Sequence, residues 1–360
     1  MTSVNCSSDT LLDWIFLHIE NGVFSLPIIL DLIPFEDYDF VIVFHAGIGQ
    51  DFSLPYLDPT PEDIPSTYVD RDMLGDPFLG VEHGIILPET ENHIRFEEGA
   101  ILFDQVSQPC DFQYGLTGVI ALMIGFASGL PPLWDLESGE SRIGIFGLMD
   151  QGSNNGRGLI PSPPDAWTRI FAGWEDPEIV KSSKEVSLSS RSENNMVKIP
   201  ITDSEYFLIE NRRNSIYAGV SIDSLRYAIW EETERYPPFI EILIDSVSIE
   251  KDENGVITAI PNYDLGLPAS GLLIWHIDED IINSGINDYS INSERIFKGV
   301  DLEEADGAQD IGYPNIHLFS DPSSGYFGDM WFDGNSEYER LTNRLGSPEF
   351  GPYTYPNTGS

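Results

Sequence analysis

The chain has 360 residues, 41% of them hydrophobic, which is enough to bury the core of one large domain or two smaller ones. Sixty Asp and Glu oppose 18 Lys and Arg, and the formal net charge is −42. A field of this sign repels nucleic acid and anionic membrane surfaces, so we expect neither as a partner. It favours a saline environment or bound cations, and composition alone does not choose between them.

Two further classes of protein are disfavoured by simple counts. Cys6 and Cys110 are too few for a disulfide framework and have no metal-ligand spacing, although a single bridge between them stays open. No apolar run approaches the roughly 20 residues that span a bilayer, so the sequence predicts no membrane insertion.

Hydrophobic spacing predicts the elements of the first half. Residues 10–20 have the pattern of a short amphipathic helix, and the continuous apolar run 40–44 indicates a buried strand. Residues 51–76 are rich in Pro, Asp and Ser, which predicts a long surface loop. A strand is expected over 96–103, followed by an apolar helix over 117–128.

The second half is predicted to be rich in strands. Asp165 is a candidate N-cap for a helix that begins at Ala166 and runs toward Gly173. The turn-like residues 252–255 suggest a hairpin. Apolar, β-branched runs predict strands at 206–209, 240–244, 256–260 and 272–275.

This order of elements predicts an α+β fold with a strand-rich second half. We expect one domain over residues 1–360, with two lobes as a further option. The lobes would cover about 1–180, which bears the helices, and about 181–360, which bears the strands, with a boundary near 175–200.

The helix at 117–128 ends in a distinctive sequence, because Gly129-Leu130-Pro131 follows it and Asp135 comes shortly after. This frame resembles the zinc helix of secreted metallopeptidases of the immune inhibitor A family. That family carries His-Glu-x-x-His and then x-x-Gly-Leu-Pro-Asp-x-Tyr-Asp. The two His positions, the Glu position and the first of the two Asp positions are here Leu122, Phe126, Met123 and Pro132.

The replaced residues cannot perform zinc proteolysis. Leu122 and Phe126 have no lone pair for a metal, and the thioether of Met123 suits neither zinc binding nor the role of general base. From Val119 to Ala127 no side chain is charged or strongly polar. We therefore expect a helix that is buried on all sides, in which the former site is filled as core.

The resemblance continues over about residues 40 to 330. Segments similar to the family occur in the same order at 43–50, 144–150, 164–167, 173–174, 205–212, 271–279 and 299–307. Their ordered occurrence is more specific than any one of them. The resemblance implies a zincin-like metallopeptidase fold, a secreted protein at an extracellular or cell-surface location, and a chain that is an excerpt of a longer protein.

One acidic cluster is the best metal candidate. Closely spaced carboxylates around Gly307, which permits a tight turn, suit the hard oxygen coordination of calcium. The spacing is not that of an EF-hand, and in so acidic a chain a solvated acidic face is the alternative. The predicted ligands are Asp301, Glu303, Glu304, Asp306 and Asp310, and Asp321, Asp329 and Asp333 of the next loop could join them.

Two functions from different classes follow. The first is a catalytically inactive, metallopeptidase-like domain that is stabilised by calcium, needs no zinc, and binds an unknown protein or peptide or serves a structural role. The second is an active hydrolase with a relocated metal site. His276, Asp278 and Glu279, which lie together at a predicted strand end, are the candidates for that site.

Overall fold

The computed structural model divides the chain into two compact units, Met1–Tyr114 and Gly115–Ser360, and each is described by itself. It describes parts of the first unit and most of the second. The described residues are 18–20, 23–25, 40–45, 65–70, 85–86, 95–96, 99–103, 115–190, 196–217, 220–235, 249–253, 257–260, 262–313, 323–335, 349–354 and 356–358.

A three-stranded sheet forms the described centre of the first unit. β7 (Gly99–Phe103) lies between β3 (Val41–His45), to which it is parallel, and β4 (Thr67–Val69), to which it is antiparallel. Two further antiparallel pairs join β1 (His18–Glu20) to β2 (Val23–Ser25) and β5 (Ile85–Ile86) to β6 (Arg95–Phe96).

This unit confirms some predictions and corrects others. The strand expected at 40–44 is confirmed by β3, and most of the strand expected at 96–103 is β7. The burial expected at 40–44 is wrong at Val43 and Phe44, which are exposed. The helix predicted over 10–20 is wrong at residues 18–20, which form β1, and its other residues lie outside those described. The loop predicted over 51–76 contains β4, where Thr67, Tyr68 and Val69 supply the β-branched and aromatic side chains that favour a strand. Both cysteines lie outside the described residues.

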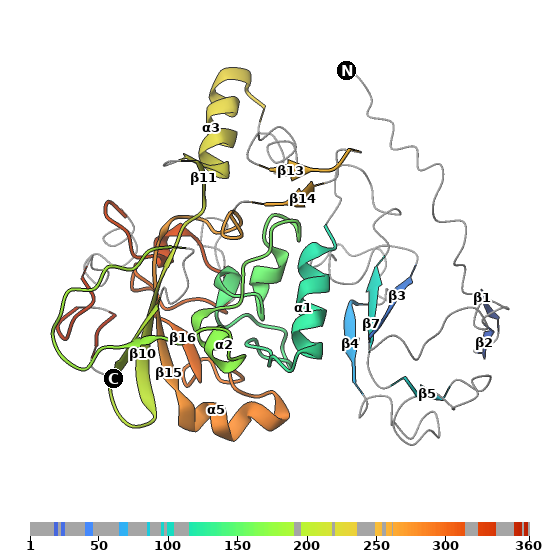
Figure 1. The fold of residues 1–360 in the computed structure, drawn as a ribbon, viewed down its shortest axis with the longest axis horizontal. Coiled ribbons are helices and arrows are strands. Elements are labelled where there is room, and N and C mark those ends of the chain that lie inside the picture. Colours follow the sequence, from blue (N-terminus) through green and yellow to red (C-terminus); the bar gives the residue numbers. More distant parts are fainter. Residues whose placement is uncertain are drawn as a thin grey trace. The chain divides into compact units, whose positions relative to one another are not determined.

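A five-stranded mixed sheet organises the second unit (Figure 1). Its strands are β8 (Glu178–Ile179), β9 (Met196–Pro200), β10 (Glu205–Arg212), β15 (Gly271–Asp278) and β16 (Val300–Leu302), in the order β16-β15-β10-β9-β8. Neighbours are antiparallel except β8 and β9, which are parallel. The strands predicted at 206–209 and 272–275 are thereby confirmed as the two central strands.

Four α-helices accompany this sheet among the described residues: α1 (Thr117–Ala127), α2 (Ala166–Phe171), α3 (Ile222–Thr233) and α5 (Glu279–Gly285). Asp165 caps α2 as predicted, because its side chain accepts the N–H of Thr168. α3 and α5 were not expected from the sequence. None of the described helices is long and apolar enough to cross a membrane.

Short elements complete the second unit. β13 (Glu250–Lys251) pairs with β14 (Ile257–Ala259), which confirms a hairpin on either side of the predicted turn at 252–255. β11 (Ser215–Tyr217) pairs with β12 (Val220–Ser221), and the strand predicted at 240–244 lies outside the described residues. Single 3-10 turns occur at Gly144–Phe146, Gln151–Asn154, Ile286–Asp288 and Phe327–Asp329.

The sheet buries apolar side chains on both faces. Tyr206, Leu208 and Trp275 belong to the main core, whereas Phe207 and Ile274 belong to a smaller cluster with Trp331. This alternation follows from the two-residue period of a strand, and it explains why apolar side chains are continuous over residues 206–209 of β10 and 272–275 of β15. The main core also includes residues that precede the sheet in sequence, among them Leu133, Phe146 and Trp167.

The sequence Gly129-Leu130 has a structural role, because it ends α1. Gly129 has a φ of +80° and its N–H donates to the carbonyl of Phe126, while the N–H of Leu130 donates to that of Gly125. These two bonds are the Schellman motif, in which glycine takes the left-handed conformation that ends a helix. At the other end, a Cβ on Gly118 would lie 1.8 Å from the carbonyl oxygen of Ser153, so the helix begins in direct backbone contact with the turn at Gln151–Asn154.

The burial predicted for α1 is only partly right. Met123 is buried, and Leu122 and Phe126 pack, half-buried, against the main core. Ile124 is 50% exposed, so the prediction of a helix buried on all sides is wrong. Apolar composition all round a helix predicts burial but does not fix which neighbours cover each face.

The described structure is therefore a mixed α+β fold, as the sequence predicted. The main core contains residues from both sides of the 175–200 region. The division into lobes at that region stays a prediction.

Candidate metal centre

The loop after β16 wraps around the carboxylate of Glu304. The two carboxylate oxygens accept the N–H groups of Asp310 at 2.8 Å and Ile311 at 3.1 Å. Gly307 turns the chain with a φ of +77°, and its N–H donates to the carbonyl of Glu304. Because only glycine adopts this conformation without strain, Gly307 allows the chain to return to the carboxylate within a few residues.

Three carboxylates meet beside this loop, and all are buried. Glu304 and Asp306 are 0% exposed and Asp329 is 1% exposed. One oxygen of each lies within 4.8 Å of one oxygen of both others. Asp329 reaches the cluster from the 3-10 turn Phe327–Asp329, and the N–H of Ala305 donates to its carbonyl oxygen at 3.0 Å. A backbone contact thus brings together two loops that are separated by more than twenty residues.

Tyr326 links two of these carboxylates. Its hydroxyl donates to Asp306 at 2.9 Å and its backbone N–H donates to Asp329 at 2.8 Å. Asp306 also accepts the N–H of Ala308. The Oδ1 atom of Asp329, in contrast, is buried and has no hydrogen-bond partner among the described residues.

Asp150 is a buried carboxylate of the same chain whose oxygens are all hydrogen-bonded, and it provides a comparison for Asp329. It accepts the hydroxyl of Ser141 and four backbone N–H groups, from residues 142, 143, 144 and 151. Burial raises the pKa of Asp150 to about 6, and these donors limit the rise. Both oxygens of Asp150 are satisfied by protein donors, which is not true of Asp329.

The pKa values of the cluster report uncompensated negative charge. Burial raises the pKa of Glu304 to about 8, although Lys298 and the two N–H donors oppose the rise. Burial, followed by the charges of Glu304 and Asp306, raises the pKa of Asp329 well above its usual value. Lys298 already forms an ion pair with Asp301. At neutral pH the cluster therefore needs protons or an added cation.

The donor set is suited to a hard cation. All three ligand groups are carboxylates, which favour calcium or magnesium, whereas zinc sites usually include His or Cys. A divalent ion would take up the unpaired oxygen of Asp329 and offset the mutual repulsion of the three groups. The described residues contain no second group of three such side chains at this spacing.

The structure places only part of the predicted acidic cluster at this site. Glu304 and Asp306 belong to it, and Asp329 joins them from the next loop. Asp301 pairs with Lys298 instead, and the carboxylates of Glu303 and Asp310 are not among the three that meet. Burial and the charge of Asp301 raise the pKa of Glu303 to about 8. Asp333 is exposed, and Asp321 lies outside the described residues.

The residues of the alternative site are engaged separately. Asp278 caps α5 by accepting the N–H groups of Asp280 and Ile281, and Glu279 accepts the hydroxyl of Tyr206. His276 lies on β15 with its ring centroid 5.3 Å from that of Phe207, and its Nε2 is buried without a hydrogen-bond partner. These three side chains do not converge as metal ligands.

The positions that correspond to zinc ligands in the resembled family face the core with apolar groups. The Met149 sulfur would lie 2.8 Å from a Cβ on Gly125, and the Phe126 ring packs edge-on against Trp134 with centroids 5.8 Å apart. No lone pair suited to zinc is present on α1 at Leu122, Met123 or Phe126. Pro132 is buried just beyond the helix.

One functional feature was missed in the sequence, namely the bridging role of Tyr326 between Asp306 and Asp329. It had no signal, because it depends on the contact between two loops. No protein-family model, characterised protein or solved structure matches the chain.

Proposed function

We propose that this protein is a catalytically inactive, metallopeptidase-like protein, similar to the immune inhibitor A family, that is stabilised by a calcium ion. In this proposal the fold is zincin-like, and α1 corresponds to the zinc helix. The protein is secreted and acts at an extracellular or cell-surface location. It binds a protein or peptide or serves a structural role, without cutting its partner.

One observation carries the calcium part of the proposal. The Oδ1 atom of Asp329 is buried, has no donor, and belongs to a cluster of three buried carboxylates. Leaving such a group unpaired costs about 1 to 3 kcal/mol or more, and a bound cation removes the cost. The apolar residues at positions 122, 123 and 126 support the absence of zinc chemistry.

A relocated hydrolase site has less support. The unpaired Nε2 of His276 is the one observation in its favour, but Asp278 and Glu279 are occupied by other contacts. One experiment, described next, distinguishes the two proposed functions.

The experiment measures calcium and zinc binding by equilibrium dialysis and elemental mass spectrometry, together with hydrolysis of casein and a broad peptide library. We expect one calcium per chain that is lost in Asp329→Asn and kept in Asp333→Asn, which removes the same charge from an exposed position. This control accounts for weak calcium binding to a chain of charge −42. Stoichiometric zinc that is lost in His276→Ala, with chelator-sensitive hydrolysis, would establish the relocated site instead.

A further inference from the structure

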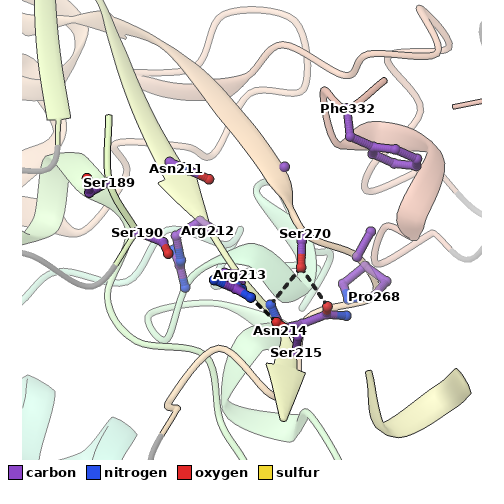
Figure 2. Close-up of a pocket in the computed structure, with 12 residues that line it drawn as sticks. Ser189, Ser190, Asn211, Arg212, Arg213, Asn214, Ser215, Pro268, Ser270 and Phe332 are labelled. Atoms are coloured by element: carbon purple, nitrogen blue, oxygen red, sulfur yellow. Dashed lines mark hydrogen bonds between the residues drawn. The ribbon is translucent and has the colours of Figure 1, made fainter. Parts of the chain in front are cut away.

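A cavity of about 840 Å³ is lined by the end of β10 and the beginning of β15 (Figure 2). Several of its polar side chains are bonded to one another. Asn214 exchanges hydrogen bonds with Ser270, and Nε of Arg213 donates to the hydroxyl of Ser215 at 2.7 Å. Because these groups already have protein partners, they give no indication of a ligand. A clearer indication of a partner lies on α3.

The helix α3 has two sides of different character (Figure 1). Leu225 and Ile229, four residues apart, pack half-buried on a small apolar cluster. At 3.6 residues per turn, Tyr227, Trp230 and Glu231 lie about 140 to 240° around the helix axis from Leu225. These three residues therefore share the outer side of the helix, opposite the side that packs on the protein.

Two aromatic rings lie on this outer side. Tyr227 is 52% exposed and Trp230 is 44% exposed, and their ring centroids are 5.6 Å apart. The outer side of a helix that packs on a protein is normally polar. Exposed Tyr and Trp are enriched where proteins bind one another, because they offer a large contact area at a low cost in conformational entropy. The pair therefore indicates a contact surface.

The same end of α3 is negatively charged. Glu231 accepts the hydroxyl of Tyr227, which raises the pKa of that tyrosine, and Glu232 and Glu234 are exposed next to it in sequence. Within the described part of the chain, no ion pair engages any of these three glutamates. Residues 222–235 contain four acidic and two basic side chains, in a chain of net charge −42. A cationic partner is therefore attracted both by these carboxylates and by the field of the whole chain.

Aromatic rings together with carboxylates favour a guanidinium group. Its charge is attracted to the face of an indole or phenol ring, its plane stacks on that ring, and its N–H groups donate to carboxylates. A lysine ammonium carries the charge without the planar stacking. A second copy of the chain is a poor partner, because it would bring a further charge of −42 to the contact.

We propose that the outer side of α3 binds an arginine-rich segment of a basic protein or peptide. A guanidinium stacks on Trp230 and Tyr227, and the carboxylates of Glu231 and Glu234 accept hydrogen bonds from arginine. This proposal rests on the proposed role in binding a protein or peptide, and it specifies the surface and the chemistry of the partner. It does not depend on calcium, because α3 contributes none of the three carboxylates of the metal site.

The test measures the binding of a labelled peptide, in which arginine and glycine alternate, by fluorescence anisotropy at about 0.15 M salt. A matched peptide has citrulline in place of arginine, which keeps the planar group and removes the charge. The variants are Trp230→Leu, which removes the ring, and Trp230→Phe, which keeps one. Trp174→Leu is the control, because Trp174 is also exposed and is also followed by two acidic residues.

A second pair of variants tests the charge. Glu231→Gln removes a carboxylate beside the rings, and Glu294→Gln removes the same charge from an exposed position elsewhere. The calcium content is measured on the same samples. A chain without calcium that still bound the arginine peptide through α3 would refute the calcium proposal and support this one, so the two failures are distinguishable.

We expect the arginine peptide to bind at least tenfold more tightly than the citrulline peptide. Trp230→Leu should weaken binding about three- to fivefold, Trp230→Phe should weaken it less, and Trp174→Leu should stay within twofold of the wild type. Glu231→Gln should weaken binding more than Glu294→Gln. Equal binding of the two peptides, absence of binding at millimolar peptide, or equal effects of Trp230→Leu and Trp174→Leu would overturn the proposal. If Trp230→Leu did not fold, equal effects of Glu231→Gln and Glu294→Gln would overturn it.

Discussion

Replacing Asp329 by Asn should change stability in opposite directions with and without calcium. Asn keeps an oxygen that can accept the N–H of Tyr326, and it places a neutral amide where Oδ1 now has no donor. Without metal, the amide removes one buried charge and can donate to a neighbouring carboxylate. With calcium, it removes a charged ligand. Asp329→Asn should therefore be more stable than the wild type in chelator and should gain nothing from calcium.

The magnitude follows from the charges in the cluster. Two unit charges 4.8 Å apart repel by about 3 to 4 kcal/mol at an effective dielectric constant near 20. We expect Asp329→Asn to recover about 3 kcal/mol at pH 8 without metal. For a unit of this size that is a rise of about 6 to 12 °C in melting temperature.

The direction of the pH dependence provides a second readout. Because the folded carboxylates have raised pKa values, the folded state binds more protons than the unfolded state between about pH 4.5 and pH 8. The contribution of these carboxylates to the stability of the metal-free wild type is therefore greatest below this window and falls as the pH rises through it. Asp329→Asn should flatten this decline. Calcium at about a thousandfold excess over its Kd should restore about 4 kcal/mol to the wild type alone.

Thermal and urea unfolding in chelator and in calcium, from pH 5 to pH 8, measure these effects. Asp333→Asn is the control for the change in net charge. If calcium raised the melting temperature of Asp329→Asn as much as that of the wild type, the ion would bind elsewhere. If Asp329→Asn were destabilised equally in chelator and in calcium, Asp329 would be a structural acid and the reasoning about repulsion would be wrong.

Four other substitutions test the packing, a buried ion-pair network and the alternative site. Gly118→Ala should lower the free energy of unfolding in urea by about 2 to 3 kcal/mol, because its Cβ would lie 1.8 Å from the carbonyl oxygen of Ser153. Gly129→Ala has open space around its Cβ but a φ of +80°, and should cost about 1 kcal/mol. Equal costs would refute the contact between Gly118 and Ser153. Glu210→Gln should cost about 3 to 5 kcal/mol at pH 7, because Glu210 is 0% exposed between Arg169 and Arg212. The two arginines lower the pKa of Glu210 despite the opposing effect of burial. The difference in unfolding free energy between wild type and Glu210→Gln is therefore present above about pH 4.5 and should shrink as the pH falls below it. A difference that grew in acid would contradict the charge assigned to Glu210. His276→Ala should leave the calcium and zinc content unchanged and cost about 1 to 2 kcal/mol through lost packing on Phe207, and a loss of bound metal would show that His276 is a ligand.

The metal site was partly predictable because Glu304 and Asp306 are closely spaced around Gly307 in the sequence. The period of β16 places Val300 and Leu302 in the main core, so Asp301 lies on the opposite face, where it pairs with Lys298. The spacing of acidic residues alone did not reveal this, since β16 was not predicted. Asp329 could be named only as an addition, because its approach depends on contacts between two loops, among them the hydrogen bonds from the N–H of Ala305 to the carbonyl of Asp329 and from Tyr326 to Asp306.

The predictability of the fold has the same physical limit. β10 and β15 were found because each contains a continuous apolar run, at 206–209 and 272–275, and such a run by itself indicates burial. α5 was missed because its residues 279–285 have little apolar periodicity, and its cap, Asp278, had been placed at the end of a strand. α3 has acidic residues only near its two ends, and its apolar side chains Leu225 and Ile229 pack on a small cluster that forms only in the folded chain.

The residues at the two ends of α1 and the residues that would bind zinc are needed for different physical reasons, and this limits what the resemblance implies. Gly129 is required to end the helix because of its left-handed conformation, and Leu130 closes the motif with its backbone N–H, whatever side chains the helix carries. Gly118 is required by the contact with Ser153, which likewise involves no catalytic group. These residues are therefore explained by folding alone, whether or not zinc ligands are present. They provide no support for peptidase activity, which would require ligands that Leu122 and Phe126 cannot supply.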